Sequence, residues 1–355
     1  MWKIAVVIGP HPDMRGGIAS VLHVYRAHGL FREAGCRFLA TTVDGSKLKK
    51  LFVALFALLR FVYLVVTGQA GLLHVHAASF GSFWRKRLFV SVANWFSVPV
   101  IYHLHSGLFR GFYENDLDDA GRQKARRMLQ TCRRVFCLNI EAKAWLESIL
   151  DNRVRVEVFP NPIEIGGAPK KQGDSPSVLF LGRLVREKGV FELLRAFHFV
   201  FQRRPDLSLV LCGTGPEAAE LRALAVELDI ASNVVFPGWV DGAQKAALFT
   251  EASVFVLPSY AEGLPMSILE AMVAEVPVVA TAVGGIPDML DHGTCGLLVP
   301  PGDVAQLTAA LIRALESPEA QLGVSRAAVR VREVYAADAV IARLRREYAG
   351  LLAQT

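Results

Sequence analysis

The chain has 355 residues, is 52% apolar and carries a net charge of +6. This length and apolar fraction suffice for the cores of two ordinary domains and argue against a single small module. Residues 1–160 hold 22 Lys and Arg against 11 Asp and Glu, whereas residues 161–355 hold 17 against 22. A basic first half suits nucleic acid, an anionic membrane or an acidic substrate, and charge alone does not choose among them.

The first residues and the cysteines argue against a secreted, a membrane-spanning and a zinc-binding protein. The apolar run at residues 4–8 is too short for a signal peptide or a membrane span, so we expect a cytoplasmic chain. The cysteines are odd in number, scattered and without zinc-type spacing, and we expect reduced, mostly buried thiols. They are Cys36, Cys132, Cys137, Cys212 and Cys295.

Through the first half, short apolar runs alternate with longer helical patterns, which is typical of βα units on a parallel sheet. The predicted strands are residues 4–8, 72–76, 98–105, 135–139 and 154–160. Gly16 and Gly17 follow the first strand, where two glycines would let backbone amides approach a phosphate ahead of the first helix.

Residues 47–66 form a helical pattern between the first two predicted strands. The apolar part from Leu51 to Val66 contains Arg60 and is too short and too charged to span a membrane. We interpret it as a well-buried helix for most of its length. Its leading lysines, 47, 49 and 50, could still touch anionic lipid.

Four histidines close two neighbouring predicted strands. His74 and His76 share a face, and we interpret them as structural; a metal pair is the alternative, although no nearby carboxylate motif completes a ligand set. His103 and His105 end the next strand. We expect alternation to send these two to opposite faces, one toward a ligand and the other into packing or solvent.

The segment after His76 combines aromatic and cationic side chains, which together suit a lipid diphosphate at a membrane surface. These side chains are Phe80, Phe83, Trp84, Arg85, Lys86 and Arg87.

Residues 161–176 are rich in Gly, Pro and polar residues and indicate a domain boundary. The strand rhythm then restarts with SVLFLG, LSLVLCG, NVVFPG, SVFVLP and VPVVAT. We therefore predict an α/β chain with two Rossmann-like parallel-sheet domains, residues 1–165 and 166–335, facing each other across a ligand cleft. Residues 336–355 are predicted to form a helix that packs back on the first domain.

The stretch EGLPMSILE follows the strand SVFVLP. Glu262 lies in a predicted loop, a helix is predicted to begin at Pro265, where a missing amide costs little, and Glu270 lies inside that helix. Backbone amides and the positive dipole end at Leu264 to Ser267 suit a diphosphate, and the carboxylates could accept hydrogen bonds from sugar hydroxyls. As an isolated pair, the glutamates would be a helix-terminal charge and a surface ion pair.

In FLGRLVREKGV, Arg183 and Lys188 follow a predicted buried strand and flank a turn closed by Gly189. Two cations at this place could clamp a diphosphate, with Arg186 as a further candidate. A solvated basic loop is the alternative for the segment taken alone.

These motifs occur together with HLHSG, FPNPI, FPGWV, VGGIPD and GLLVPPGD. In this combination the chain resembles family 4 of the retaining, GT-B-fold glycosyltransferases (glycosyl transferases group 1), and within it members from bacterial polysaccharide biosynthesis. The resemblance is strong over residues 178–303 and thinner over residues 1–160, where acceptor-specific sequence varies in the family. It therefore supports donor chemistry better than acceptor identity.

The resemblance implies roles in donor binding. Arg183 and Lys188 would bind the diphosphate, Glu270 the nucleotide ribose and Glu262 hydroxyls of the transferred sugar. The adjoining donor-binding positions would be Gly263, Leu264 and Pro265.

Further roles follow from the same resemblance. Gly16 and Gly17 would cradle phosphate from the first domain, His105 would lie near the anomeric centre, and Gly238 and Val240 would lie beside the base. Asn161 matches a hinge-side position. The catalytic residues implied are His105, Glu262, Arg183 and Lys188.

The function implied is transfer of a hexosyl group from a GDP- or UDP-linked sugar, with retention, to a growing oligosaccharide. We expect a polyprenyl-diphosphate-linked acceptor, a role in bacterial surface or exopolysaccharide biosynthesis, a peripheral position on the inner face of the membrane, and no nucleic-acid partner. Asp118 and Asp119 lie in a charged, predicted helix, so no DxD-type metal motif is apparent. We expect no metal or other cofactor, with the cations stabilising the departing diphosphate.

Two other functions stay open. A sugar-nucleotide 2-epimerase of the same fold would share the donor but need no acceptor. A non-catalytic membrane- or nucleic-acid-binding protein would use the basic first half, but the clustered diphosphate and sugar motifs argue against it.

Overall fold

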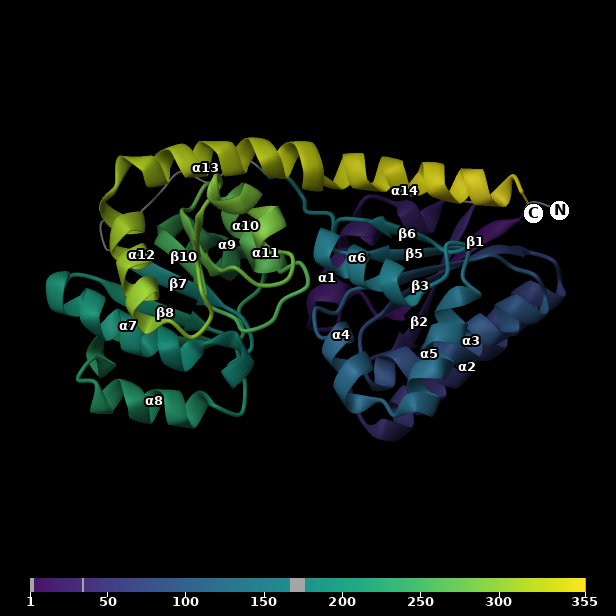
Figure 1. Cartoon of the computed structure of the whole chain (residues 1–355), viewed down its shortest axis with the longest axis horizontal. Helices are drawn as coiled ribbons and strands as arrows, with labels where there is room; N and C mark the ends of the chain where they lie inside the picture. The colour runs from purple at the N-terminus through teal and green to yellow at the C-terminus, as the bar shows by residue number, and fades with distance from the viewer. Residues whose placement is uncertain (1–2, 34, 167–175, 355) are drawn as a thin grey trace. The chain divides into compact units, whose positions relative to one another are not determined.

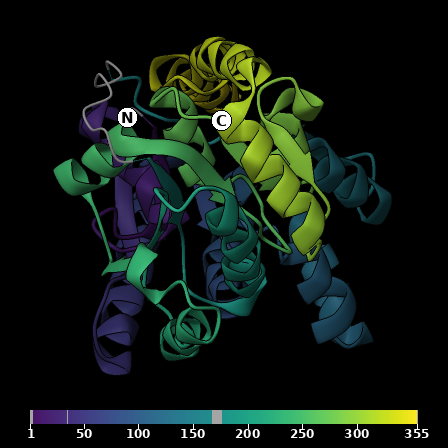
Figure 2. The ribbon, with the colours of Figure 1, turned by 90° about the vertical axis from the view of Figure 1, so that its left-hand side faces the viewer.

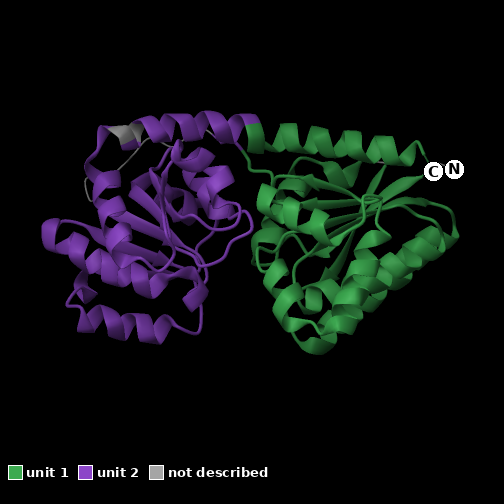
Figure 3. Cartoon of the chain, in the orientation of Figure 1, with its two compact units in different colours: residues 1–164, 334–355 green, residues 165–333 purple. Residues whose placement is uncertain are grey.

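The computed structural model describes residues 3–33, 35–166 and 176–354 (Figure 1). The chain divides into two compact units, which Figure 3 colours separately. Unit 1 consists of residues 1–164 and 334–355, and unit 2 of residues 165–333. The C-terminal helix therefore belongs to the same unit as the first strands.

Unit 1 is built on a six-stranded parallel sheet in the order β2-β1-β3-β4-β5-β6. Its strands are β1 Ile4–Pro10, β2 Cys36–Thr42, β3 Ala70–Ala77, β4 Val100–Leu104, β5 Arg134–Cys137 and β6 Arg155–Val158. The strand order reverses between β1 and β3. Every residue of β3 and β4 is buried, because helices cover both faces of the sheet.

The helices of unit 1 are α1 Gly17–Ala27, α2 Lys47–Val66, α3 Gly81–Trp95, α4 Phe109–Gly111, α5 Asp119–Gln130, α6 Ile140–Ile149 and α14 Ala337–Leu352. Helices α2, α3 and α5 share a core with Val6, Val75 and Tyr102 on one face of the sheet. Helices α1 and α14 pack against β1, and α14 also against β3 (Figure 1). Tyr348 of α14 reaches His74 of β3.

The exposed face of α2 contradicts the prediction of a well-buried helix. Only Ala57, Phe61, Leu64 and Val65 of its twenty residues are buried. An apolar stripe on the opposite face is exposed: Leu48, Leu51, Phe52, Leu55, Phe56, Leu59, Tyr63 and Val66. Hydropathy alone could not separate the two faces, because both are apolar. Among the described residues, no helix combines the length and the hydropathy that a membrane span requires.

Unit 2 holds a second six-stranded parallel sheet, in the order β12-β11-β10-β7-β8-β9. Its strands are β7 Ser177–Leu181, β8 Ser208–Cys212, β9 Val234–Gly238, β10 Ala252–Leu257, β11 Val278–Thr281 and β12 Leu297–Val299. The chain proceeds outward from β7 to β9, returns to β10 beside β7, and proceeds outward again. This is the doubly wound order of Rossmann domains, with its switch point between β7 and β10.

The helices of unit 2 are α7 Val190–Arg203, α8 Ala218–Glu227, α9 Gly242–Glu251, α10 Met266–Val273, α11 Ile286–Met289, α12 Val304–Glu316 and α13 Pro318–Arg330. The yellow-green α12 packs on α7 and against β10, β11 and β12 (Figure 2).

The ten strands predicted from apolar runs are all present in the structure. Two further strands, β2 and β12, were not predicted. In β2 only Cys36 and Thr41 are fully buried, since the strand is at the edge of its sheet and lacks a continuous apolar run. The other, β12, is an edge strand of three residues. All five cysteines are buried and unbridged, as predicted, and burial raises the pKa of Cys212 to about 12.

Candidate functional site

A lysine and a glutamate meet at the switch point of unit 2. Lys188 ends a short 3-10 turn after β7, and Glu262 lies in the loop after β10. Their side chains form an ion pair between Nζ and Oε1, with 24% of the lysine and 9% of the glutamate side chain exposed. Carboxyl ends of strands at a switch point are where doubly wound sheets bind ligands. Two residues predicted to hold a donor are thus brought together there.

Glycine at position 189 permits this approach of the two loops. Gly189 has φ 67°, and a Cβ there would lie 2.0 Å from the carbonyl oxygen of Pro258. No other residue fits, since both the left-handed backbone and the contact exclude a side chain. The backbone N–H of Tyr260 also donates to the carbonyl of Glu187 at 2.8 Å, which ties the two loops together.

Neighbouring side chains and backbone hold Glu262 in place. Ser259 Oγ donates to Glu262 Oε1 at 2.7 Å, and Thr281 Oγ1 donates to the Ser259 carbonyl at 2.5 Å. Gly284, with φ 53°, packs so closely that a Cβ would lie 1.9 Å from the Glu262 carbonyl oxygen. One carboxylate oxygen therefore accepts from an ammonium and a hydroxyl, which orients the group.

Glu270 has a separate cationic partner that the sequence did not reveal. Lys245 of α9 donates from Nζ to Glu270 Oε1 at 2.7 Å, and the glutamate side chain is 17% exposed. The two residues lie 25 positions apart on different helices. No motif marks Lys245, because only the packing of α9 beside α10 brings it to the carboxylate.

The other donor-side positions of unit 2 differ in exposure. Leu264 and Pro265 are buried, and Gly263 is half-buried and accepts from the backbone N–H of Gly285 at 3.0 Å. These residues lead into α10, whose first turn contains no acidic residue. The positive end of the helix dipole therefore lies beside the Glu262 loop.

The two arginines that follow β7 differ in their surroundings. Arg183 is exposed, whereas Arg186 pairs with Glu220 and lies over the ring of Phe191 at 4.4 Å. Arg186 is thus already engaged.

At the end of β9, Gly238 has φ 81° and accepts from the backbone N–H of Gly213 at 2.8 Å. Val240, two residues on, is buried.

In unit 1, Gly16 and Gly17 lie at the switch point between β1 and β3. Gly17 begins α1, and both glycines are exposed. A Cβ at either position would have no atom within 4 Å. The backbone at this helix N-terminus is therefore open to an approaching group, and phosphate binding by the glycine pair stays a prediction.

His105 lies just after β4 with both ring nitrogens engaged. Its Nδ1 lies 3.1 Å from Asn161 Oδ1, and its Nε2 lies 2.8 Å from His76 Nδ1. Although part of the residue is accessible, burial of the ring lowers its pKa to about 3, and the hydrogen bond to Asn161 offsets this only in part. The surroundings of His105 therefore favour its neutral form near pH 7.

The expectation that His103 and His105 face opposite sides of the sheet is wrong. Their ring centroids lie 3.9 Å apart, and the tilted rings of His74 and His76 lie 4.2 Å from each other on the same side. The physical reason is the strand period of two, which places residues two apart on one face. The four histidines form one column on the α14 side of the sheet.

The sequence grouped Lys86 with Arg85 and Arg87 as cations that suit a membrane surface. The structure separates Lys86 from the two arginines. Lys86 is 1% exposed, while both arginines are exposed. Burial, with a smaller effect of the neighbouring Arg85, lowers the pKa of Lys86 to about 7. The basic segment therefore offers two cations to a surface.

The lowered pKa predicts a pH-dependent stability. Between pH 7 and the unfolded pKa near 10.4, the unfolded chain binds more protons, so stability rises with pH. Relative to Lys86→Met, the wild type should gain on the order of 1 kcal/mol in unfolding free energy from pH 6 to pH 8, since one unit of pKa is worth about 1.4 kcal/mol. Urea unfolding at both pH values measures this. Arg87→Met should show no such change, and a pH-independent difference for Lys86→Met would contradict the prediction.

Comparison with solved structures places both units in one known fold. Anabaena HepE, solved in complex with UDP and glucose, superposes with a TM-score of 0.77 at 16% identity, over 98% of this chain and 100% of that one. Two six-stranded parallel sheets of this kind define the GT-B fold of glycosyltransferases, and this chain has that fold.

The family match falls on unit 2. Residues 164–330, just under half of the chain, match the family model described as glycosyl transferases group 1. The 2-deoxystreptamine glucosyltransferase of Streptomyces kanamyceticus is 34% identical over 161 residues, which are 45% of this chain and 41% of that protein.

A second relative is the GDP-mannose-dependent alpha-(1-6)-phosphatidylinositol monomannoside mannosyltransferase of Mycolicibacterium smegmatis. It is 36% identical over 162 residues, 43% of this chain and 42% of that protein. The alignments thus span less than half the length of these two relatives.

Proposed function

We propose that the chain transfers a hexosyl group from a nucleoside diphosphate sugar to a lipid-linked oligosaccharide, with retention of anomeric configuration. The observation that carries the proposal is the Lys188–Glu262 ion pair at the switch point of unit 2, beside the N-terminus of α10. A cation and a helix dipole suit a diphosphate, and an oriented carboxylate suits sugar hydroxyls. The family model that this segment matches supports the same chemistry.

In the proposed reaction the acceptor hydroxyl oxygen bonds to the anomeric carbon as the bond from that carbon to the diphosphate oxygen breaks. The hydroxyl proton passes to the departing diphosphate. Arg183 and Lys188 would neutralise the charge on that diphosphate, so the reaction would need no metal ion. The neutral His105 would contact the sugar rather than carry the proton, since its pKa is far below 7.

The donor nucleotide is UDP or GDP in this proposal. HepE was solved with UDP, and the mycobacterial relative is named for GDP-mannose. Glu270 would bind the ribose from its position beside Lys245. Gly238 and Val240 would border the base.

A thermal-shift screen tests the donor side. We expect UDP or GDP, at 100 times its Kd, to raise the unfolding free energy by about 2.7 kcal/mol and hence the Tm by several degrees. Glu270→Gln should lose most of that shift, because the ribose hydroxyls lose their charged acceptor. Glu251→Gln, an exposed glutamate at the end of α9, is the matched control. No shift with either nucleotide would contradict the proposal.

We also propose that the protein acts at the inner face of a cell membrane, on a polyprenyl-diphosphate-linked acceptor of surface or exopolysaccharide biosynthesis. The exposed apolar stripe of α2 supports this, since stripes of this kind mark interaction sites. Lys47, Lys49 and Lys50 are exposed in the first turn of the same helix and suit anionic headgroups. The neighbouring α3 adds Leu88 and Trp95, both exposed.

A further inference from the structure

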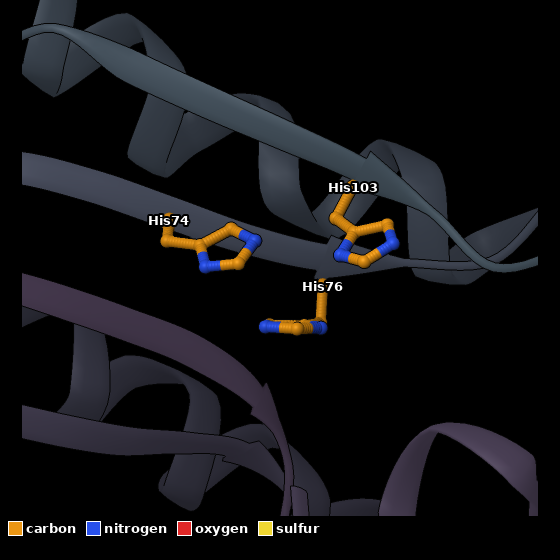
Figure 4. Close-up of side chains that lie close together, drawn as sticks. All are labelled: His74, His76 and His103. Carbon is orange, nitrogen blue, oxygen red and sulfur yellow. The ribbon is translucent and has the colours of Figure 1, made fainter. Parts of the chain in front are cut away.

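Three buried histidines of unit 1 point their ring nitrogens toward one another. His74 and His76 lie on β3, and His103 lies on β4, where it pairs in register with His76 (Figure 4). All three are fully buried. One nitrogen from each ring lies within 4.8 Å of the other two. The cluster lies next to His105, which contacts His76, and it is on the α14 side of the sheet.

Within the described part of the chain, four nitrogens of this cluster make no hydrogen bond: His74 Nε2, His76 Nε2, and Nδ1 and Nε2 of His103. The backbone of Phe159 interacts with His103 and favours its charged form, against the larger effect of burial. A buried polar group left without a partner costs about 1–3 kcal/mol. Four such atoms in one place indicate that a further group satisfies them.

The outer hydrogen bonds fix which nitrogen of His76 carries the proton. Asn161 Oδ1 can only accept, so Nδ1 of His105 donates to it. Nε2 of the neutral His105 therefore accepts, and the proton between the two histidines belongs to His76 Nδ1. His76 Nε2 is left with a bare lone pair that faces the cluster.

His74 is held in a similar way from another element. Its Nδ1 lies 2.6 Å from the hydroxyl of Tyr348 on α14, and this hydroxyl can accept the Nδ1 proton. Nε2 of His74 then also carries a lone pair toward the cluster. Histidine ligands of metal ions almost always donate their second ring N–H to an outer acceptor in this manner.

We propose that His74, His76 and His103 bind one Zn²⁺ ion through a nitrogen of each ring. Imidazole nitrogens suit zinc, and three neutral histidines with a fourth position for water or hydroxide form a known zinc ligand set. Zinc–nitrogen bonds of about 2.0–2.1 Å place ligand nitrogens about 3.3 Å apart in a tetrahedron, so nitrogens that now lie within 4.8 Å of one another would approach by up to about 1.5 Å on binding. The ion would join β3 to β4 and, through Tyr348, to α14.

This ion would be separate from the donor residues of unit 2, and it would lie beside His105 of unit 1, whose Nε2 is 2.8 Å from His76 Nδ1. It would also fix the tautomer of His76 and so hold His105 in place. Lys86 is close enough to disfavour positive charge on His76. Its loss should therefore leave zinc binding intact, which makes Lys86→Met a control that alters the same buried region without removing a ligand.

The test uses the full chain without a polyhistidine tag, loaded with Zn²⁺ and dialysed. Elemental analysis should find about one zinc per chain in the wild type, in Lys86→Met and in His292→Gln, whose histidine is exposed in unit 2. His103→Phe should retain less than about a tenth of that amount, with far-UV circular dichroism as the check on its fold. Equal zinc in the wild type and His103→Phe would overturn the proposal, as would a wild type that retains none.

Cobalt provides a second readout that needs no variant. Titration of the metal-free wild type with Co²⁺ should produce intense visible absorption that saturates at one equivalent, as tetrahedral coordination requires. Addition of Zn²⁺ should then abolish it by displacement. Weak absorption equal to that of aqueous Co²⁺ would overturn the proposal even if His103→Phe does not fold.

Discussion

Replacing Lys188 by alanine should lower kcat/KM for the sugar nucleotide by about 10²- to 10³-fold, the usual cost of removing one group that stabilises developing charge. Lys188 is the cation that the fold places against the oriented Glu262 carboxylate at the switch point of unit 2. The substitution removes the proposed diphosphate partner and leaves the 9%-exposed Glu262 with the Ser259 hydroxyl as a donor. The rate of transfer from the donor that the thermal-shift screen selects measures the effect.

Arg186→Ala is the matched control for this prediction. Arg186 lies two residues from Lys188, but it is engaged by Glu220 and Phe191, so its loss should change kcat/KM by less than about threefold. Because an ion pair is also lost in Lys188→Ala, thermal unfolding of both variants must show a native fold at the assay temperature. A folded Lys188→Ala enzyme within threefold of the wild type would contradict the donor-site assignment.

Placing two glutamates on the exposed face of α2 should abolish binding to anionic vesicles. Phe52 and Phe56 are 70% and 69% exposed. Burying a phenylalanine side chain is worth about 1.5–3 kcal/mol, so the double variant Phe52→Glu/Phe56→Glu should lose at least about 10²-fold in partitioning. Flotation with phosphatidylglycerol vesicles measures the bound fraction. The fold should persist, since neither side chain belongs to the core.

Two comparisons separate the apolar and electrostatic parts of this binding. Changing Lys47, Lys49 and Lys50 to glutamine should weaken binding to anionic vesicles by about 10²-fold, at about 1 kcal/mol for each charge, and should reduce its salt dependence. Phe199→Glu, at a 51%-exposed position of α7 in unit 2, should bind as the wild type does. Equal flotation of the wild type and the α2 double variant would contradict the membrane proposal.

The fold followed from local sequence to a large extent. Strands buried on both faces must be continuously apolar, so runs such as 4–8 and 178–181 identify parallel sheets without tertiary information. Edge strands lack this constraint, and β2 and β12 were therefore not predicted. Glycines also predicted turns where the backbone excludes a side chain, as at Gly189.

The sequence by itself determined the strand alternation of both units and the residue types gathered after β7 and β10. Tertiary structure alone decided how those residues pair: Lys188 with Glu262, and Lys245 with Glu270. It also decided that α2 exposes one of its two apolar faces, that Lys86 is buried, and that four histidines form one column. The physical reason is that pairing and burial depend on which elements pack together across long stretches of chain, and neither periodicity nor composition encodes that choice.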